Sequence, residues 1–290
     1  MKINKLTVIG TGLIGGSFAL ALKSAKAVER VVGVGRSQEN LVRALDLGIV
    51  DEIAEASRAL KGAELVMIAV PVAQTARVLA EITPYLTTST IVTDAGSTKQ
   101  DVVAAARQTM GAHFPRFVPA HPIAGGERSG AQAAQGDLFR DKNVVLTPLA
   151  ETDREALDFV TEAWLAVGAK VRQMLPEDHD RIFAAVSHLP HLLAYALVDC
   201  LAARANAGEL FGFAAGGFRD FTRIASSSPE MWRDICLANR EALNAELNDY
   251  QRELAEVQRL ISEANVEALG QLFVRARNAR NEWLAGKGEQ

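Results

Sequence analysis

Two short polar segments contain the side chains best suited to acid–base chemistry. One reads Asp94-Ala95-Gly96-Ser97-Thr98-Lys99, and the other reads His121-Pro122-Ile123-Ala124-Gly125-Gly126-Glu127. His121 follows an apolar run, and imidazole is the side chain best matched to proton transfer near neutral pH, so we expect His121 to be a catalytic base. Ser97 either takes part in that chemistry or is simply the N-cap of the next helix, the usual role of a serine in such a place.

A glycine-rich segment near the N-terminus has the spacing of a dinucleotide-binding loop. Gly10-Thr11-Gly12-Leu13-Ile14-Gly15 reads G-x-G-x-x-G between an expected strand and an expected helix. Its first glycine permits a tight turn, its second lets backbone approach a pyrophosphate, and its third allows close helix–strand packing. Amide groups at the start of the helix attract the pyrophosphate charge. The residues expected on the dinucleotide are Gly10, Thr11, Gly12, Leu13, Ile14 and Gly15, with Val70 and Pro71 at the end of a later strand.

The residues after the second expected strand bear on the choice of cofactor. An NAD site places Asp or Glu about 20 residues beyond the last glycine, where the carboxylate binds the ribose 2′-hydroxyl. This chain has Val34-Gly35-Arg36-Ser37 there. Arg36 can pair with a 2′-phosphate and Ser37 can hydrogen-bond to it, although a solvated Arg36 and a helix-capping Ser37 are the plainer interpretation. We expect Gly35, Arg36 and Ser37 to bind NADP in preference to NAD.

The elements that must position these residues change in character along the chain. Short β-branched runs alternate with amphipathic stretches up to about residue 174, which predicts βαβ units around a parallel sheet. From residue 175 the sequence is Ala- and Leu-rich and predicts only helices. We therefore expect a Rossmann-like α/β dinucleotide-binding domain over residues 1–174 and an all-α domain over residues 175–290. Strands are expected at residues 6–9, 31–34, 65–70, 91–93, 117–120, 144–147 and 170–173, and helices at residues 13–25, 38–47, 75–82, 99–110 and 154–167.

Length and charge exclude several classes of protein. The 290 residues are enough for about two domains, and 31 Lys and Arg against 35 Asp and Glu give a net charge of −4. That balance excludes a strongly basic nucleic-acid binder. Two cysteines are too few for a disulfide framework or a zinc site, so we expect no metal and a reducing, cytoplasmic compartment. The uncharged stretch at residues 182–198 predicts a buried core helix rather than a membrane span.

A heptad-like apolar seam lies in the last part of the chain. Leu243, Leu247, Tyr250, Leu254, Val257 and Ile261 are spaced by alternating steps of four and three. The seam predicts either a helix packed inside its own domain or a subunit interface, and we slightly favour the interface, hence a homodimer.

Five segments together resemble a known family. They are the glycine-rich loop, the segment that ends at Lys99, the segment that begins at His121, Ser187-His188-Leu189-Pro190-His191, and Gly217-Phe218-Arg219-Asp220-Phe221-Thr222-Arg223-Ile224-Ala225. In this order they resemble the prephenate/arogenate (cyclohexadienyl) dehydrogenase family of tyrosine biosynthesis, over almost the whole chain. The resemblance implies oxidative decarboxylation of a cyclohexadienyl dicarboxylate to an aromatic product, with hydride transfer to NAD(P).

The resemblance also implies roles for single residues. His121 would take the proton of the ring hydroxyl, Ser97 would orient His121, and Arg223 would pair with a substrate carboxylate. His191 would contact the substrate, and His188 would be structural or support that contact. From the residue type alone, we expect Pro190 to interrupt the helix between the two histidines. Glu127 and Asp220 would be gating or orienting partners, with Glu127 on the substrate.

Other interpretations stay open at this point. Arg223 also suits a structural ion pair, and His188 and His191 suit an apolar core. A β-hydroxyacid dehydrogenase shares the domain order, but that family relies on a lysine in the first long helix after the sheet, and residues 179–213 contain none. A non-catalytic NADP-binding sensor is the other alternative. No residue selects prephenate over arogenate, and we expect the rate to rise with pH near the ordinary histidine pKa of about 6.5.

Overall fold

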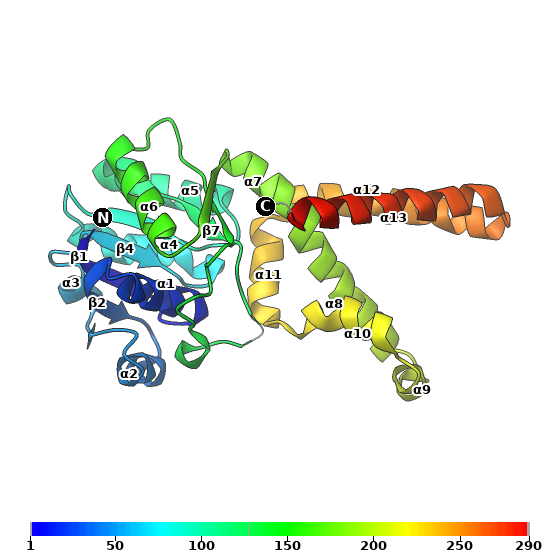
Figure 1. Ribbon diagram of the computed structural model, residues 1–290, viewed down its shortest axis with the longest axis horizontal. Helices are drawn as coiled ribbons and strands as arrows, with labels where there is room; N and C mark the ends of the chain where they lie inside the picture. The colour runs from blue at the N-terminus through cyan, green and yellow to red at the C-terminus, as the bar shows by residue number, and fades with distance from the viewer. Residues whose placement is uncertain (1, 127, 289–290) are drawn as a thin grey trace. The chain divides into compact units, whose positions relative to one another are not determined.

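The computed structural model describes residues 2–126 and 128–288, and the chain divides into two compact units, Met1–Ala242 and Leu243–Gln290 (Figure 1). Among the described residues, the first unit contains nine strands and the helices up to α11, and the second contains most of α12 and all of α13. The elements are β1 Ile3–Ile9, α1 Leu13–Ser24, β2 Val28–Val34, α2 Gln38–Asp46, β3 Glu52–Ile53, α3 Ala56–Ala59, β4 Leu65–Ile68, α4 Val72–Ile82, β5 Ile91–Asp94, α5 Gln100–Thr109, β6 Phe117–Val118, β7 Ala120–Pro122, β8 Asn143–Leu146, α6 Arg154–Ala166, β9 Lys170–Gln173, α7 Pro176–Phe183, α8 Leu189–Ala202, α9 Ala207–Gly212, α10 Gly216–Thr222, α11 Pro229–Ala238, α12 Arg240–Ser262 and α13 Val266–Gly288.

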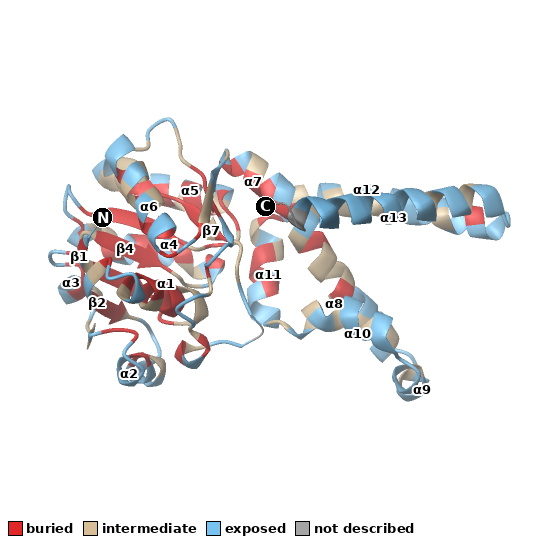
Figure 2. Ribbon diagram, in the orientation of Figure 1, coloured by how far each residue is buried: buried red, intermediate tan, exposed pale blue. Residues whose placement is uncertain are grey.

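A six-stranded parallel sheet forms the centre of the first unit. Its strand order is β3-β2-β1-β4-β5-β6, and alternate residues of each central strand enter two separate apolar clusters. Phe18 of α1 and Trp164 of α6 pack on one face, while Leu79 of α4 and Val103 of α5 pack on the other. Figure 2 shows the resulting buried strands. The predicted Rossmann-like domain followed by helices is confirmed.

The strand expected at residues 117–120 is divided between two sheets. β6 closes the edge of the large sheet beside β5, whereas β7 pairs antiparallel with β8 in a three-stranded sheet of order β7-β8-β9. Pro119 separates the two strands, and a proline has no amide hydrogen to continue a ladder. His121 therefore lies within β7, opposite Val145, rather than at the end of a strand.

Pro190 does not interrupt the first long helix after the sheets, contrary to the sequence-based prediction. The chain runs from α7 through a π-helical turn, Ala184–His188, directly into α8. A π-turn is a usual way for a helix to accommodate one residue that cannot bond in register. Residues Pro176–Ala202 are long and apolar enough, by length and composition alone, to span a membrane, and 28% of an apolar 18-residue window within them is buried. The stretch is thus less buried than a core helix.

The second unit consists of helical sequence whose apolar residues are only partly covered. Leu254 is 48% exposed and Ile261 62% exposed on α12, and Phe273 and Trp283 on α13 are 58% and 56% exposed. Of the six residues of the seam predicted from the heptad spacing, Leu243 is buried, Leu247, Tyr250 and Val257 are half-buried, and Leu254 and Ile261 are exposed.

Candidate active site

A cavity of about 400 Å³ lies at the carboxyl ends of the central strands. Its walls come from the glycine-rich loop, the end of β4 at Ala69–Val72, the turn after β5 at Ala95–Ser97, and the segment that begins with His121. Ser228, Met231 and Ile235 complete it from the helical part of the same unit. This is the edge at which parallel α/β sheets bind their ligands.

The glycine-rich loop has the geometry of a pyrophosphate cradle. Gly10 adopts φ +98°, and a Cβ there would lie 2.3 Å from the Ala69 carbonyl oxygen. At Gly15 a Cβ would lie 2.2 Å from the Gly10 carbonyl oxygen, so only glycine permits this packing of α1. A Cβ on Gly12, by contrast, would meet no protein atom within 4 Å, and Gly12 caps α1 without a side chain. The loop thus leaves open space in front of helix amides, which fits a bound dinucleotide phosphate.

The residues expected at the adenosine ribose lie outside the described lining of the cavity, on the surface after β2. Gly35, Arg36 and Ser37 are exposed. Ser37 Oγ accepts from the Asn40 amide at 3.2 Å as the N-cap of α2, so the capping role of Ser37 is present. Asn40 Nδ2 in turn donates to Thr11 Oγ1 at 3.0 Å, which ties α2 to the glycine-rich loop.

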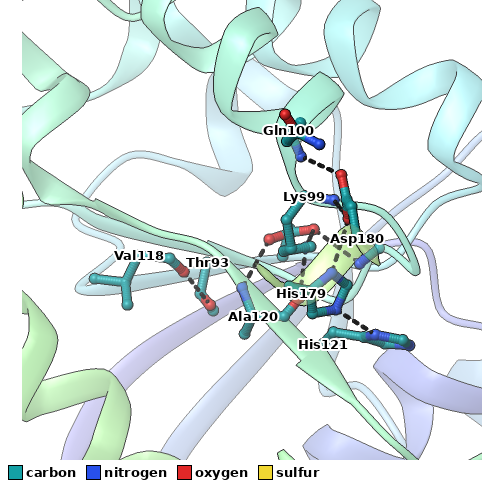
Figure 3. Close-up of polar contacts among 10 residues, drawn as sticks. Thr93, Lys99, Gln100, Val118, Ala120, His121, His179 and Asp180 are labelled. Atoms are coloured by element: carbon teal, nitrogen blue, oxygen red, sulfur yellow. Dashed lines mark hydrogen bonds and ion pairs between the residues drawn. The ribbon is translucent and has the colours of Figure 1, made fainter. Parts of the chain in front are cut away.

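A buried ion pair fixes the peptide that precedes His121. Lys99 Nζ lies 2.5 Å from Asp94 Oδ2, and the two side chains are 0% and 1% exposed. Lys99 Nζ also donates to the Ala120 carbonyl oxygen at 2.7 Å; Figure 3 labels both residues. Asp94 Oδ1 accepts from the Ala120 amide at 2.9 Å. One ion pair therefore holds both backbone hydrogen-bonding groups of Ala120, which restricts the position of His121.

His121 begins a hydrogen-bonded series that ends on a carboxylate. His121 Nδ1 lies 2.8 Å from His179 Nε2, and His179 Nδ1 lies 2.8 Å from Asp180 Oδ1 (Figure 3). Asp180 also accepts from the backbone amides of Lys99 at 2.8 Å and Gln100 at 2.9 Å, where α5 begins. We name His121, His179 and Asp180 the histidine chain.

Burial controls the protonation of the histidine chain. It lowers the pKa of His121 well below 6.5, and the neighbouring His179 lowers this pKa further. Burial also lowers the pKa of His179. For Asp180, burial would raise the pKa, but hydrogen bonds from His179, Gln100 and Lys99 outweigh it and hold the pKa below its usual value. Two neutral imidazoles and one carboxylate follow, and the acid limb expected near pH 6.5 moves to lower pH.

Ser97 and Glu127 are the other two residues that we expected to act beside His121. Ser97 lines the same cavity, but among the contacts of the described residues its hydroxyl makes no hydrogen bond to His121. The partner that orients the His121 ring in this structure is His179. Glu127 lies outside the described residues, so its predicted contact stays a prediction.

A second group of aromatic and basic side chains lies in the helical part of the first unit. The His191 ring stacks on Trp232 with centroids 3.6 Å apart, and His191 Nδ1 lies 2.8 Å from the Ser187 carbonyl oxygen. Arg223 is exposed, at the start of the 3₁₀ turn Arg223–Ser226. Burial lowers the pKa of His191, the hydrogen bond to the Ser187 carbonyl opposes this, and the charge of Arg223 lowers the pKa further. Asp220 is exposed on α10.

His188 is buried beside the histidine chain rather than in the cavity wall. Its Nδ1 accepts from Asn239 Nδ2 at 3.1 Å, and the same amide group lies 2.7 Å from the Asp180 carbonyl oxygen. Burial lowers the pKa of His188 to about 4. These contacts agree with a structural role.

The sequence-based reasoning missed several residues of this region. His179 and Asp180 were not singled out, and Lys99 and Asp94 were recognised only as part of a polar segment. Trp232 was also missed, although its buried indole Nε1 has no hydrogen-bond partner among the described residues. The one local signal was a His-Asp pair in the first turns of a helix that starts with a proline at residue 176.

Comparisons with known proteins agree over both parts of the chain. Residues 18–173 match the family model of the prephenate dehydrogenase nucleotide-binding domain, and residues 175–275 match that of the prephenate dehydrogenase dimerization domain. Prephenate dehydrogenase of Bacillus subtilis is 38% identical over 95% of this chain and 75% of its own length. Cyclohexadienyl dehydrogenase of Zymomonas mobilis is 34% identical over 95% of this chain and 94% of its own length.

Solved structures give the same result. Prephenate dehydrogenase of Aquifex aeolicus, in complex with hydroxyphenyl propionate and NAD⁺, superposes with a TM-score of 0.92 at 35% identity, covering 97% of this chain and 99% of the other. Arogenate dehydrogenase of Synechocystis superposes with a TM-score of 0.82 at 30% identity, covering 96% of this chain and 99% of the other.

Proposed function

The chain belongs to the prephenate dehydrogenase family and is a dehydrogenase with a nicotinamide cofactor, and on this premise we propose that it oxidatively decarboxylates prephenate, arogenate or both, to 4-hydroxyphenylpyruvate or tyrosine. The observation that carries the proposal is the position of His121, a base kept neutral by burial, in the wall of a cavity that also contains the glycine-rich loop. The two substrates differ in a keto or an amino group on the side chain, away from the reacting carbon.

The reaction balances without a net proton. The hydroxyl of the substrate ring gives up its proton, a hydride leaves the same carbon, and the bond to the ring carboxylate breaks to release carbon dioxide. The electron pair of that bond completes the aromatic ring, and the oxygen ends as a phenol. A bound nicotinamide supplies the hydride acceptor.

His121 is the group we assign to the hydroxyl. Its neutral imidazole accepts the proton as the hydride leaves and returns it to the phenolate oxygen. Aromatisation supplies the driving force, so the protein chiefly orients the reactants. Ser97, in the same wall, is the residue we propose to contact the hydroxyl together with His121.

The helical part of the unit supplies the substrate contacts in this proposal. Arg223 pairs with a carboxylate of the substrate, because a guanidinium offers a planar fork of donors. His191, fixed on Trp232, contacts the substrate side chain. Glu127, for which the sequence suggests a gating or orienting role on the substrate, remains part of the proposal by resemblance alone.

For the cofactor we favour NADP over NAD. Residues 35–38, directly after β2, contain no carboxylate, and the exposed Arg36 and Ser37 are our candidates for holding a 2′-phosphate. The Aquifex aeolicus relative was solved with NAD⁺, which makes NAD the second candidate. Removing Arg36 (Arg36→Ala) separates the two, because it should lower kcat/KM with NADP and leave kcat/KM with NAD unchanged.

We propose a homodimer formed through the helical part, in the cytoplasm. The half-exposed Leu254 and Ile261 on α12, with Phe273 and Trp283 on α13, are the apolar surface that a second copy would cover. The match of residues 175–275 to a dimerization domain supports this proposal. Sedimentation equilibrium tests it, with a monomer as the contradicting result.

The experiment that tests the function is a matrix of two substrates and two cofactors. Formation of reduced cofactor is followed by absorbance with prephenate and with arogenate, each with NAD⁺ and NADP⁺. We expect turnover with at least one substrate and the higher kcat/KM with NADP⁺. Binding of NADP⁺ without turnover of either substrate would instead favour a non-catalytic sensor.

A further inference from the structure

The hydrogen bonds of the histidine chain have a direction that the Asp180 carboxylate imposes. Both of its oxygens already accept backbone amides, from Lys99 and from Gln100, so it acts only as an acceptor. At 2.8 Å from Asp180 Oδ1, His179 Nδ1 must therefore carry a hydrogen. A neutral His179 then has its lone pair on Nε2.

The lone pair on His179 Nε2 also fixes the direction of the hydrogen bond to His121. His179 Nε2, having only a lone pair, requires that His121 Nδ1 donate across the 2.8 Å contact. A neutral His121 with its hydrogen on Nδ1 has its lone pair on Nε2. None of the described residues hydrogen-bonds to Nε2, and the His121 side chain lines the cavity.

We propose that His179 and Asp180 are positioning residues that select the tautomer of His121, so that Nε2 always presents a lone pair to the substrate hydroxyl. This inference rests on the proposed function, because it explains how His121 is prepared for that reaction. With the opposite tautomer, Nε2–H could donate a hydrogen bond to the hydroxyl but could not accept its proton. Asp180 thus controls the tautomer of His121 through the intervening His179 ring.

The distribution of charge around the histidine chain supports this assignment. Two carboxylates are buried here, and they have different partners. Asp94 is neutralised by the Lys99 ammonium, whereas the Asp180 carboxylate is hydrogen-bonded by His179 and by two backbone amides at the start of α5. The negative charge of Asp180 is therefore free to stabilise a positive charge that appears on the two imidazoles.

This charge matters during the reaction, because His121 is transiently an imidazolium. When Nε2 takes the hydroxyl proton, Nδ1–H still donates to His179, and Asp180 stabilises the cation through that ring. The net reaction releases no proton, so the proton can return from Nε2 to the phenolate oxygen. His179 and Asp180 are buried, and such a buried pair behind His121 is suited to the return of the proton.

The packing around the two rings keeps the arrangement in place. Phe183 of α7 contacts the two rings, with centroids 4.9 Å from His121 and 4.5 Å from His179. The charged or titratable groups that face His121 are His179 on α7, Lys99 with Asp94 beside β7, and His188 in the π-turn. His179 is the member of this set that hydrogen-bonds to the His121 ring.

The direct test is ¹⁵N NMR of the full chain with labelled histidine. Only five histidines are present, so the side-chain ¹⁵N–¹H correlations can be assigned by single substitutions. We expect wild-type His121 to carry its hydrogen on Nδ1 at pH 7, without substrate. A wild-type His121 with its hydrogen on Nε2 overturns the proposal even if every variant misfolds.

Two substitutions of His179 test the mechanism of selection. In His179→Leu no acceptor remains, so we expect His121 to populate the Nε2–H tautomer and kcat to fall about 10²- to 10⁴-fold, the range of a general base. In His179→Gln an amide oxygen can take the place of Nε2 as acceptor, and we expect the Nδ1–H tautomer and much of kcat to return. Equal losses in the two variants, with the tautomer of His121 unchanged, would indicate a merely structural role and contradict the proposal.

The controls separate this inference from the proposed function. His113 lies in the 3₁₀ segment Gly111–Arg116, away from the histidine chain, so His113→Gln should change neither the His121 signals nor kcat. The affinity for NADP⁺ should remain within twofold in all variants. The tautomer of His121 is measured without substrate, so it can be confirmed or refuted whether or not the wild-type protein turns over prephenate.

Discussion

The region around His121 and the region around Arg223 hold their functional side chains in different ways. Around His121, an ion pair fixes the preceding peptide, a second histidine fixes the ring, and the supporting side chains are almost fully buried. Around Arg223, the arginine is exposed on a short 3₁₀ turn, and His191 is half-buried against Trp232. The first arrangement is preorganised for chemistry at one atom, and the second can adjust to a bound anion. Substitutions in the first region should therefore change kcat, and substitutions in the second should change KM.

The largest stability effect is expected from breaking the ion pair under His121. Lys99→Met leaves the Asp94 carboxylate buried without its counter-charge, which typically costs about 3–5 kcal/mol. We expect the free energy of unfolding to fall by about that amount, measured by urea denaturation, with a loss of kcat in the protein that remains folded.

The double variant Asp94→Asn with Lys99→Met is the matched control. Because it leaves no unpaired charge, it should recover part of the lost stability. A Lys99→Met protein as stable as the wild type would contradict the claim that the buried ion pair holds the region around His121 in place.

The next effect concerns the affinity for substrate. Arg223→Ala removes the proposed counter-charge of a substrate carboxylate, so we expect KM for prephenate to rise about 10- to 100-fold while kcat changes only a few-fold. Arg223→Lys keeps the charge but not the planar fork, so its KM for prephenate should lie between those of the wild type and Arg223→Ala. An unchanged KM in steady-state assays would give Arg223 a structural role.

The smallest effect is a pH dependence of stability. Burial lowers the pKa values of His121, His179, His188 and His191 in the folded protein, so the unfolded chain binds more protons below pH 6.5. Stability is then full above about pH 6.5 and falls as the pH decreases towards 4. His188 alone, with a pKa of about 4, should contribute a loss of about 2 kcal/mol at pH 5.

Urea denaturation at pH 7, 6 and 5 measures this effect. His188→Asn, which keeps an acceptor for Asn239 but does not titrate, should show a shallower loss. Equal stability of the wild-type protein at pH 7 and pH 5 would mean that these imidazoles are not buried as neutral groups.

Features set by local sequence could be predicted, and features set by long-range packing could not. Strand β4 is a continuous apolar run, and the glycine-rich loop lies between neighbouring elements, so local patterns were enough to predict them. His121 could be found because it follows an apolar run in the sequence, although the structure places it within β7. Pro190 misled the prediction because the π-turn that accommodates it depends on its neighbours in the fold.

The supporting residues could not be predicted for a physical reason. His179 lies 58 positions from His121 along the chain, and only the packing of α7 against β7 and α5 brings the rings together. Lys99 and Asp94 look like ordinary surface charges in a sequence, because their burial results from long-range packing rather than from local pattern. Trp232 likewise becomes significant only through its stack on His191.

The most direct test of this account is to measure steady-state kinetics of the wild type and His121→Asn with varied prephenate at saturating cofactor. Asparagine cannot take a proton from the hydroxyl, so kcat should fall about 10²- to 10⁴-fold while the affinity for the cofactor stays unchanged. A His121→Asn protein with near-normal kcat would contradict the assignment of His121 as the base, and with it the division of labour between the two regions.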